Sequence, residues 1–260
     1  MSKNFDPNQN LYFFNNKDTT PLVFIHGVGL DHQMWYEQVN YLNEFSILTY
    51  DLLGHGKTPF NKENLNFNDF SNQLLEILNY LKIDKIHLVG FSLGSLVALD
   101  FSSRHQDKIE KLILIGTTYK RSDQERALVL DRYNQAKLNK PISKQALKRW
   151  FSDKYLEDNP KTYDLFMNIL NKKPEDHKNF LKAYKLFANH NDDIASIQKI
   201  DRKTLVMTGA DDPGSSPSMS KELVKDLINS SYIEIKNGKH LCSIECADDV
   251  NINIKNFINN

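Results

Sequence analysis

Four short apolar runs, at residues 22–25, 86–89, 112–115 and 205–207, constrain the fold most strongly. A strand with one wet face alternates apolar and polar residues, whereas a strand buried on both faces is apolar throughout. The four runs are therefore predicted to be neighbouring strands of a parallel sheet.

The segments between these runs predict helices. Phe70, Leu74, Leu78 and Leu81 are spaced to share one helix face. Strands alternating with helices are typical of an α/β architecture. Further strands are expected at residues 46–50 and 231–235, and an antiparallel starter strand at 11–14 is joined to 22–25 by a polar turn.

The pattern changes between residues 119 and 198. Runs typical of buried strands are absent there, and charged residues alternate with large apolar residues at helical spacing. We therefore predict a helical insertion at 119–198 in a core formed by 1–118 and 199–260. Its helices are expected near 124–138, 143–151, 161–171 and 175–189.

Charge and hydropathy exclude several functional classes. Lys and Arg total 33, as do Asp and Glu, so the chain lacks the basic excess typical of nucleic-acid binding. The longest uncharged stretches, at 19–30 and 86–99, are shorter than the ~18 residues that a membrane helix needs. Residues 1–16 do not resemble a secretory signal, so we expect a cytoplasmic protein with no membrane or nucleic-acid partner.

Metal and cofactor sites are not predicted. The two cysteines, Cys242 and Cys246, are too few and too close to organise this chain, and no Cys and His grouping resembles a zinc site. We expect reduced thiols that act as small hydrophobic side chains.

The segment Gly-Phe-Ser-Leu-Gly at residues 90–94 directly follows one predicted strand and precedes a helical pattern. A serine at such a sharp strand-to-helix turn has a strained backbone and an exposed hydroxyl group, and the flanking glycines let strand and helix approach. Ser92 is therefore the candidate nucleophile.

A serine hydroxyl needs a base, and that base needs an acid that orients it. Asp211 and Asp212 follow the predicted strand at 204–207, and His240 follows the strand at 231–235. The order serine, acid, histidine is the order typical of this strand-turn-helix nucleophile.

These motifs and three others resemble the capped α/β-hydrolases. His-Gly-Val-Gly at 26–29 is similar to the oxyanion loop of that family, residues 51–58 to its D-x-x-G-H-G-x-S/T turn, and the segment 240–245 to its final H-x-x-x-x-E motif. Segments at 149–151, 159–160 and 212–217 are similar to 3-oxoadipate enol-lactonases and related carboxylesterases.

The resemblance implies an α/β-hydrolase fold with a mostly parallel sheet, flanking helices and a helical cap. It selects Asp212 over Asp211 as the acid. The backbone N–H groups of Val28 and Leu93 are expected to form the oxyanion hole. His26 and His55 are expected to order their loops rather than act in catalysis.

The cap should form the ceiling of the substrate pocket. Trp150 and Phe151 are the pocket residues that we select from its large aromatic side chains, although most of these are expected to pack against the core. Arg149, Arg126 or Arg132 could bind a substrate carboxylate, but arginines on helices usually face solvent.

The leading hypothesis is a cofactor-free serine hydrolase that cleaves small carboxylic esters or lactones through an acyl-enzyme on Ser92. Two alternatives stay open: hydrolysis of a carbon–carbon bond in a ring-fission product, and a ligand receptor with slow turnover. The related epoxide hydrolases and haloalkane dehalogenases carry aspartate at the position of Ser92, which disfavours both activities. The sequence leaves the oligomeric state open.

Overall fold

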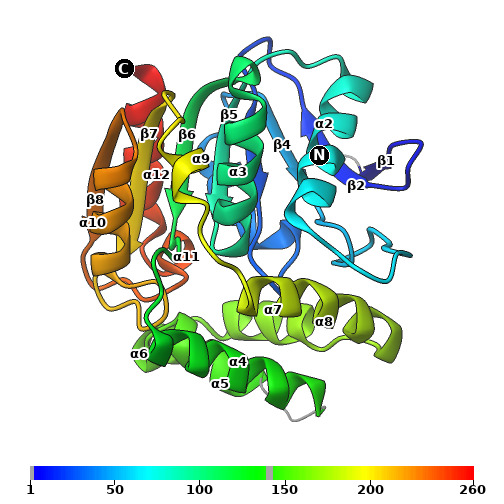
Figure 1. Ribbon diagram of the computed structural model, residues 1–260, viewed down its shortest axis with the longest axis vertical. Coiled ribbons are helices and arrows are strands. Elements are labelled where there is room, and N and C mark those ends of the chain that lie inside the picture. The colour runs from blue at the N-terminus through cyan, green and yellow to red at the C-terminus, as the bar shows by residue number, and fades with distance from the viewer. Residues whose placement is uncertain (1–2, 139–142) are drawn as a thin grey trace.

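The computed structural model describes residues 3–138 and 143–260. Its sheet has eight strands in the order β1-β2-β4-β3-β5-β6-β7-β8 (Figure 1). β1 and β2 pair antiparallel, as do β2 and β4, and all other neighbours are parallel. The strands are β1 (Lys3–Phe5), β2 (Leu11–Asn15), β3 (Leu22–Ile25), β4 (Ile47–Tyr50), β5 (Ile86–Phe91), β6 (Ile109–Ile115), β7 (Lys203–Gly209) and β8 (Ser230–Ile235).

The parallel sheet predicted from the apolar runs is confirmed, and helices cover both of its faces. In β3, Val23 packs in the cluster that includes α2 and α3, whereas Phe24 packs in the cluster that includes α12. This alternation is why the run is apolar throughout. The core helices are α1 (Tyr36–Tyr41), α2 (Phe67–Leu81), α3 (Leu93–Arg104), α9 (Ile194–Ile197), α10 (Pro217–Asp226), α11 (Cys242–Glu245) and α12 (Ala247–Asn259), with short 3-10 turns at His32–Trp35 and Gln106–Lys108.

Five helices lie together across one end of the sheet, at the bottom of Figure 1. These five, which we call the cap helices, are α4 (Asp123–Lys137), α5 (Ser143–Trp150), α6 (Asp153–Asp158), α7 (Pro160–Leu170) and α8 (Pro174–Ala188). Buried side chains of α4 and α8 join one core cluster and those of α5 and α7 join the other. α9 instead contacts α3. The division into a core and a cap at 119–198 stays a prediction.

Several elements were not predicted, among them β1, α6 and the helices α1, α9, α10 and α11. β1 is a short edge strand whose sequence, Lys-Asn-Phe, has no apolar run. α6 is a six-residue helix that begins after Ser152, whose side chain accepts a hydrogen bond from the backbone N–H of Tyr155. Within the described residues, no helix is both long and apolar enough to cross a membrane.

Candidate active site

Ser92 lies at the turn between β5 and α3, as its motif predicted. Its φ of 53° and ψ of −115° are strained for a residue with a Cβ atom. A Cβ atom at Gly90 would lie 2.4 Å from the carbonyl oxygen of Gly94, and one at Gly94 would lie 2.2 Å from that of Ile25. Only glycines at both positions let the strand and the helix approach this closely, so the motif places Ser92 at the end of the sheet.

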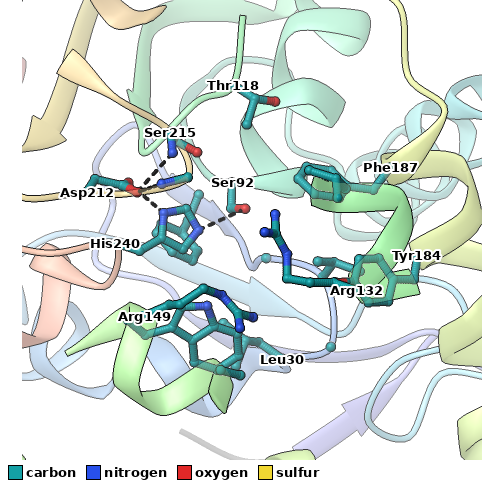
Figure 2. Close-up of a pocket in the computed structure, with 18 of the residues that line it drawn as sticks. Leu30, Ser92, Thr118, Arg132, Arg149, Tyr184, Phe187, Asp212, Ser215 and His240 are labelled. Carbon is teal, nitrogen blue, oxygen red and sulfur yellow. Dashed lines mark hydrogen bonds and ion pairs between the residues drawn. The ribbon is translucent and has the colours of Figure 1, made fainter. Parts of the chain in front are cut away.

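His240 connects Ser92 to Asp212 (Figure 2). Its Nε2 atom is 3.2 Å from Ser92 Oγ, and its Nδ1 atom is 2.6 Å from Asp212 Oδ2. The other oxygen of Asp212, Oδ1, accepts hydrogen bonds from the backbone N–H groups of Gly214 and Ser215, at 2.8 and 2.9 Å. The serine, the imidazole and the carboxylate therefore form one hydrogen-bonded chain.

The two candidate acids differ in their surroundings. Asp212 is 4% exposed and hydrogen bonds to the imidazole, whereas the side chain of Asp211 faces solvent. Glu245, from the last motif, accepts hydrogen bonds from the backbone N–H groups of Ser152 and Lys239. It thereby ties the segment before His240 to the loop that begins α6.

The N–H groups of Val28 and Leu93 lie in the two backbone segments that border Ser92. Neither group has a hydrogen-bond acceptor in the part of the chain that the structure describes. A pair of unpartnered N–H groups beside a serine hydroxyl is the arrangement that stabilises an oxyanion. The side chains of Val28 and Ser92 line the same cavity.

Two buried histidines hold the loop that carries Val28. His26 Nε2 accepts a hydrogen bond from the backbone N–H of Leu52 at 2.9 Å, and His55 Nε2 accepts one from Gly29 at 3.1 Å. Both bonds require a neutral ring nitrogen, and burial lowers the pKa of each histidine. These contacts fit the expected ordering role of both residues.

A cavity opens above Ser92, between the sheet and the cap helices. Its volume is about 100 Å³, on the scale of a small organic molecule. The wall is largely apolar, and its polar groups include Ser92, His240, Asp212, two arginines and Thr118. The residues that line it are Gly27, Val28, Gly29, Leu30, Phe91, Ser92, Thr118, Val129, Arg132, Ala146, Arg149, Trp150, Leu170, Phe180, Tyr184, Phe187, Asp212, Pro213, Gly214, Ser215 and His240.

The two aromatic residues selected for the pocket are placed differently. Trp150 lines the cavity, but Phe151 does not. Phe151 is fully buried and packs against Tyr155 and Phe166 inside the cap, so its assignment to the pocket is corrected here. Phe151 directly follows α5, and its backbone N–H still donates to the carbonyl oxygen of Leu147. Its side chain therefore points about 100° away from that of Trp150, which is why only one of the pair faces the cavity.

The three candidate arginines also differ in whether they line the cavity. Arg132 and Arg149 line the cavity. Arg126 instead donates to the carbonyl oxygens of Arg121 and His190, away from it. The sequence offered no signal for this choice, because the direction of each side chain depends on how the cap helices pack. The same holds for Val129 in α4 and Ala146 in α5, which were not predicted to line the pocket. Thr118, in the loop after β6, was not predicted either.

Outside the cavity, ligand atoms of Asp31, His32 and Asp51 lie within 4.8 Å of one another. The carboxylate oxygens of the two aspartates already accept hydrogen bonds from backbone N–H groups. Asp51 accepts bonds from the backbone N–H groups of His32 and Lys57, and Asp31 caps the turn at Gln33. This cluster closes the turn at residues 51–58.

Comparisons with known proteins agree with this architecture. Residues 20–246 match the α/β-hydrolase fold family. The chain belongs to the α/β-hydrolase fold family. The identity of its fold, first given as a resemblance of motifs, is thereby confirmed.

Among curated members of this α/β-hydrolase family, the chain is 26% identical over 247 residues to (E)-2-((N-methylformamido)methylene)succinate hydrolase of Acinetobacter baylyi. That alignment covers 94% of this chain and 92% of that protein. It is also 26% identical over 233 residues to 3-oxoadipate enol-lactonase 1 of the same species, covering 89% and 86% of the two chains. A crystal structure of the enol-lactonase from Burkholderia xenovorans LB400 superposes with a TM-score of 0.88 at 23% identity, covering 97% and 98%.

Proposed function

We propose that this α/β hydrolase is a serine hydrolase that cleaves small carboxylic esters or lactones. The observation that carries the proposal is the hydrogen-bonded chain from Ser92 through His240 to Asp212, on the wall of a cavity. Such a chain makes a serine hydroxyl nucleophilic at neutral pH without a metal or cofactor.

In the first half of the proposed reaction, Ser92 Oγ attacks the carbonyl carbon while its proton moves to His240 Nε2. The negative charge on the former carbonyl oxygen is stabilised by the N–H groups of Val28 and Leu93. When the carbon–oxygen bond of the ester breaks, His240 returns the proton to the leaving alkoxide. The alcohol leaves, or stays tethered if the substrate is a lactone, and an acyl group remains on Ser92.

In the second half, a water molecule takes the place of the leaving alcohol. His240 Nε2 removes a proton from this water as its oxygen attacks the acyl carbon. The bond between Ser92 and the acyl group then breaks, and the same proton returns to the serine. Asp212 holds Nδ1 protonated throughout, so that Nε2 stays free to accept.

The choice of esters and lactones has three supports. The relatives above include enol-lactonases, and the cavity is small and largely apolar apart from Ser92 and a few other polar groups. Ser92 also favours acyl transfer over attack on an epoxide or an alkyl halide, because the related epoxide hydrolases and haloalkane dehalogenases use an aspartate at this position as the nucleophile.

The test is steady-state hydrolysis of p-nitrophenyl esters of increasing acyl length, with an unsaturated lactone in the same panel. Wild type is compared with Ser92→Ala and with Ser218→Ala, which removes an exposed hydroxyl in α10. We expect many turnovers per molecule in wild type and Ser218→Ala, and near-background rates in Ser92→Ala. A fluorophosphonate probe should lose fluoride to Ser92 Oγ and leave the mass of its phosphonyl group on a peptide that contains Ser92.

Equal activity in wild type and Ser92→Ala would refute the role of this serine. A single stoichiometric burst of product, without further turnover, would favour a ligand receptor. If every ester and the lactone stay intact while a β-diketone ring-fission product is cleaved, the reaction is carbon–carbon hydrolysis.

A further inference from the structure

An asparagine followed by a glycine lies in the loop that carries His240, which we define as residues 236–241. Asn237 and Gly238 are the one Asn-Gly pair in the sequence. The side chain of Asn237 is exposed, and its amide group has no hydrogen-bond partner among the described residues. Its backbone φ of 59° lies in the left-handed region, which asparagine tolerates better than most residues. A free side-chain amide therefore lies beside a backbone nitrogen that no Cβ atom of its own residue shields.

Asparagine is thermolabile because its side chain can react with the backbone nitrogen of the next residue. Here the nitrogen of Gly238 attacks Cγ of Asn237 and gives up its proton, and the side-chain nitrogen leaves as ammonia. The product is a succinimide ring, which water then opens at one of its two carbonyl groups. Opening at the backbone carbonyl gives isoaspartate, whose main chain runs through Cβ and Cγ. Opening at the side-chain carbonyl gives aspartate with the original main chain.

The structure restrains the attacking nitrogen only weakly. The N–H of Gly238 donates one hydrogen bond, to the carbonyl oxygen of Ile235, and this bond is long at 3.4 Å. The turn follows β8, which forms one edge of the sheet. Exposed turns open locally at a small cost in free energy, and a glycine lets the opened backbone rotate freely. The nitrogen can therefore reach the side chain of Asn237 without global unfolding.

The rest of the His240 loop is held firmly on both sides of the histidine. Gly238 is buried, and its carbonyl oxygen accepts a hydrogen bond from the N–H of Asp211 at 2.9 Å. On the other side, the N–H of Leu241 donates to the carbonyl oxygen of Trp150 at 3.0 Å. His240 lies between these two anchors, so the position of its ring depends on both.

We propose that Asn237 is a site of spontaneous conversion to isoaspartate and that the conversion inactivates the enzyme. Isoaspartate adds one carbon–carbon bond, about 1.5 Å, to the main chain. Only Lys236 and Asn237 lie between the end of β8 and Gly238, and so short a turn cannot absorb this length. The anchored Gly238 must move, and His240 with it. A displacement of about 1 Å at a catalytic group can lower the rate ~10²-fold.

The modification goes beyond the proposed function, and only its effect on turnover rests on that function. The test keeps wild type in warm, mildly alkaline buffer for several days and samples it at intervals. Peptide mass spectrometry measures the gain of about one mass unit at Asn237, and an isoaspartyl O-methyltransferase with a labelled methyl donor measures isoaspartate. Hydrolysis of a p-nitrophenyl ester is measured on the same samples. Asn229, which is exposed and followed by Ser230 at the other end of β8, is the internal comparison.

Asn237→Asp and Asn237→Gly are the matched variants. Aspartate carries the charge of both products on an unaltered main chain, so it separates the effect of charge from that of chain length. Glycine adopts a positive φ freely and has no side chain that could react. Both variants should start with wild-type activity, and Asn237→Gly should keep that activity throughout the incubation.

We expect isoaspartate to accumulate at Asn237 well before Asn229 reacts, and the remaining activity to equal the unmodified fraction. An Asn237 that stays intact in the folded protein, while it converts in a denatured sample in the same buffer, would overturn the site. Isoaspartate without a matching loss of activity, or an equal loss in Asn237→Gly, would overturn its effect on catalysis. Ester hydrolysis that survives Ser92→Ala would instead overturn the proposed function and leave the modification, which is read by mass, standing.

Discussion

Replacing Asp212 with asparagine should remove activity by reversing the tautomer of His240. In the native site, Asp212 Oδ1 accepts two backbone N–H groups, at 2.8 and 2.9 Å, while Oδ2 accepts the Nδ1 proton of His240 at 2.6 Å. Asparagine has only one side-chain oxygen. That oxygen must stay with the two backbone donors, since turning the amide around would lose both bonds, at about 1 kcal/mol each.

The amide nitrogen of the substituted side chain would then face His240 Nδ1 as a donor. The ring can satisfy it only by moving its own proton to Nε2, the atom that must accept the proton of Ser92. We expect kcat to fall about 10⁴-fold, which corresponds to about 5 kcal/mol of transition-state stabilisation. Because the two side chains have the same shape, the unfolding temperature should change by only a few degrees.

The assay is the initial rate of p-nitrophenyl ester hydrolysis, with thermal unfolding measured on the same samples. Asp211→Asn is the matched control, because it makes the same change one residue earlier on an exposed side chain, and it should keep wild-type activity. An Asp212→Asn variant that folds and retains more than about a tenth of wild-type kcat would refute this account of the acid.

Two further predictions concern stability. Gly94→Ala should lower the free energy of unfolding in chemical denaturation by about 2 kcal/mol or more, because its Cβ atom would lie 2.2 Å from the carbonyl oxygen of Ile25. The control is Gly214→Ala, whose Cβ atom would have only one atom within 4 Å, and its free energy of unfolding should stay within about 0.5 kcal/mol of wild type. Equal effects of the two substitutions would contradict the packing argument. Burial lowers the pKa of His26 and His55 below the unfolded value of about 6.5. The free energy of unfolding should therefore be highest above that pH and should fall on acidification below it, because the unfolded chain then binds protons that the folded chain does not. A thermal midpoint that is constant or rises on acidification across this range would count against this linkage.

Much of the fold followed from local patterns in the sequence. The apolar runs predicted the parallel strands, and the run at 22–25 has the same bounds as β3. The predicted ranges of α4, α5, α7 and α8 differ from the observed bounds by one residue at every end except the start of α5, which agrees. β1 and α6 were not predicted, because a short edge strand and a six-residue helix bury too few apolar side chains to show a periodic pattern in the sequence.

The candidate site divides in the same way. Ser92, Asp212 and His240 could be selected from the sequence because each lies in the turn or loop after a strand, and parallel strands bring their carboxyl ends to one edge. The cap residues that line the cavity could not be selected from the sequence. A helix carries side chains on every side, and which side faces a cavity depends on how it packs against helices distant in the sequence.

The sequence by itself therefore determined the sheet, the strained serine turn and the order of the candidate catalytic residues, because these depend on local spacing and backbone sterics. Only the tertiary structure decided the lining of the cavity. It turned Trp150 toward the substrate space and Phe151 into the cap, and it directed Arg132 and Arg149 inward but Arg126 toward the loop at His190. The physical reason is that side-chain direction follows from helix packing, which involves contacts between residues far apart in the chain.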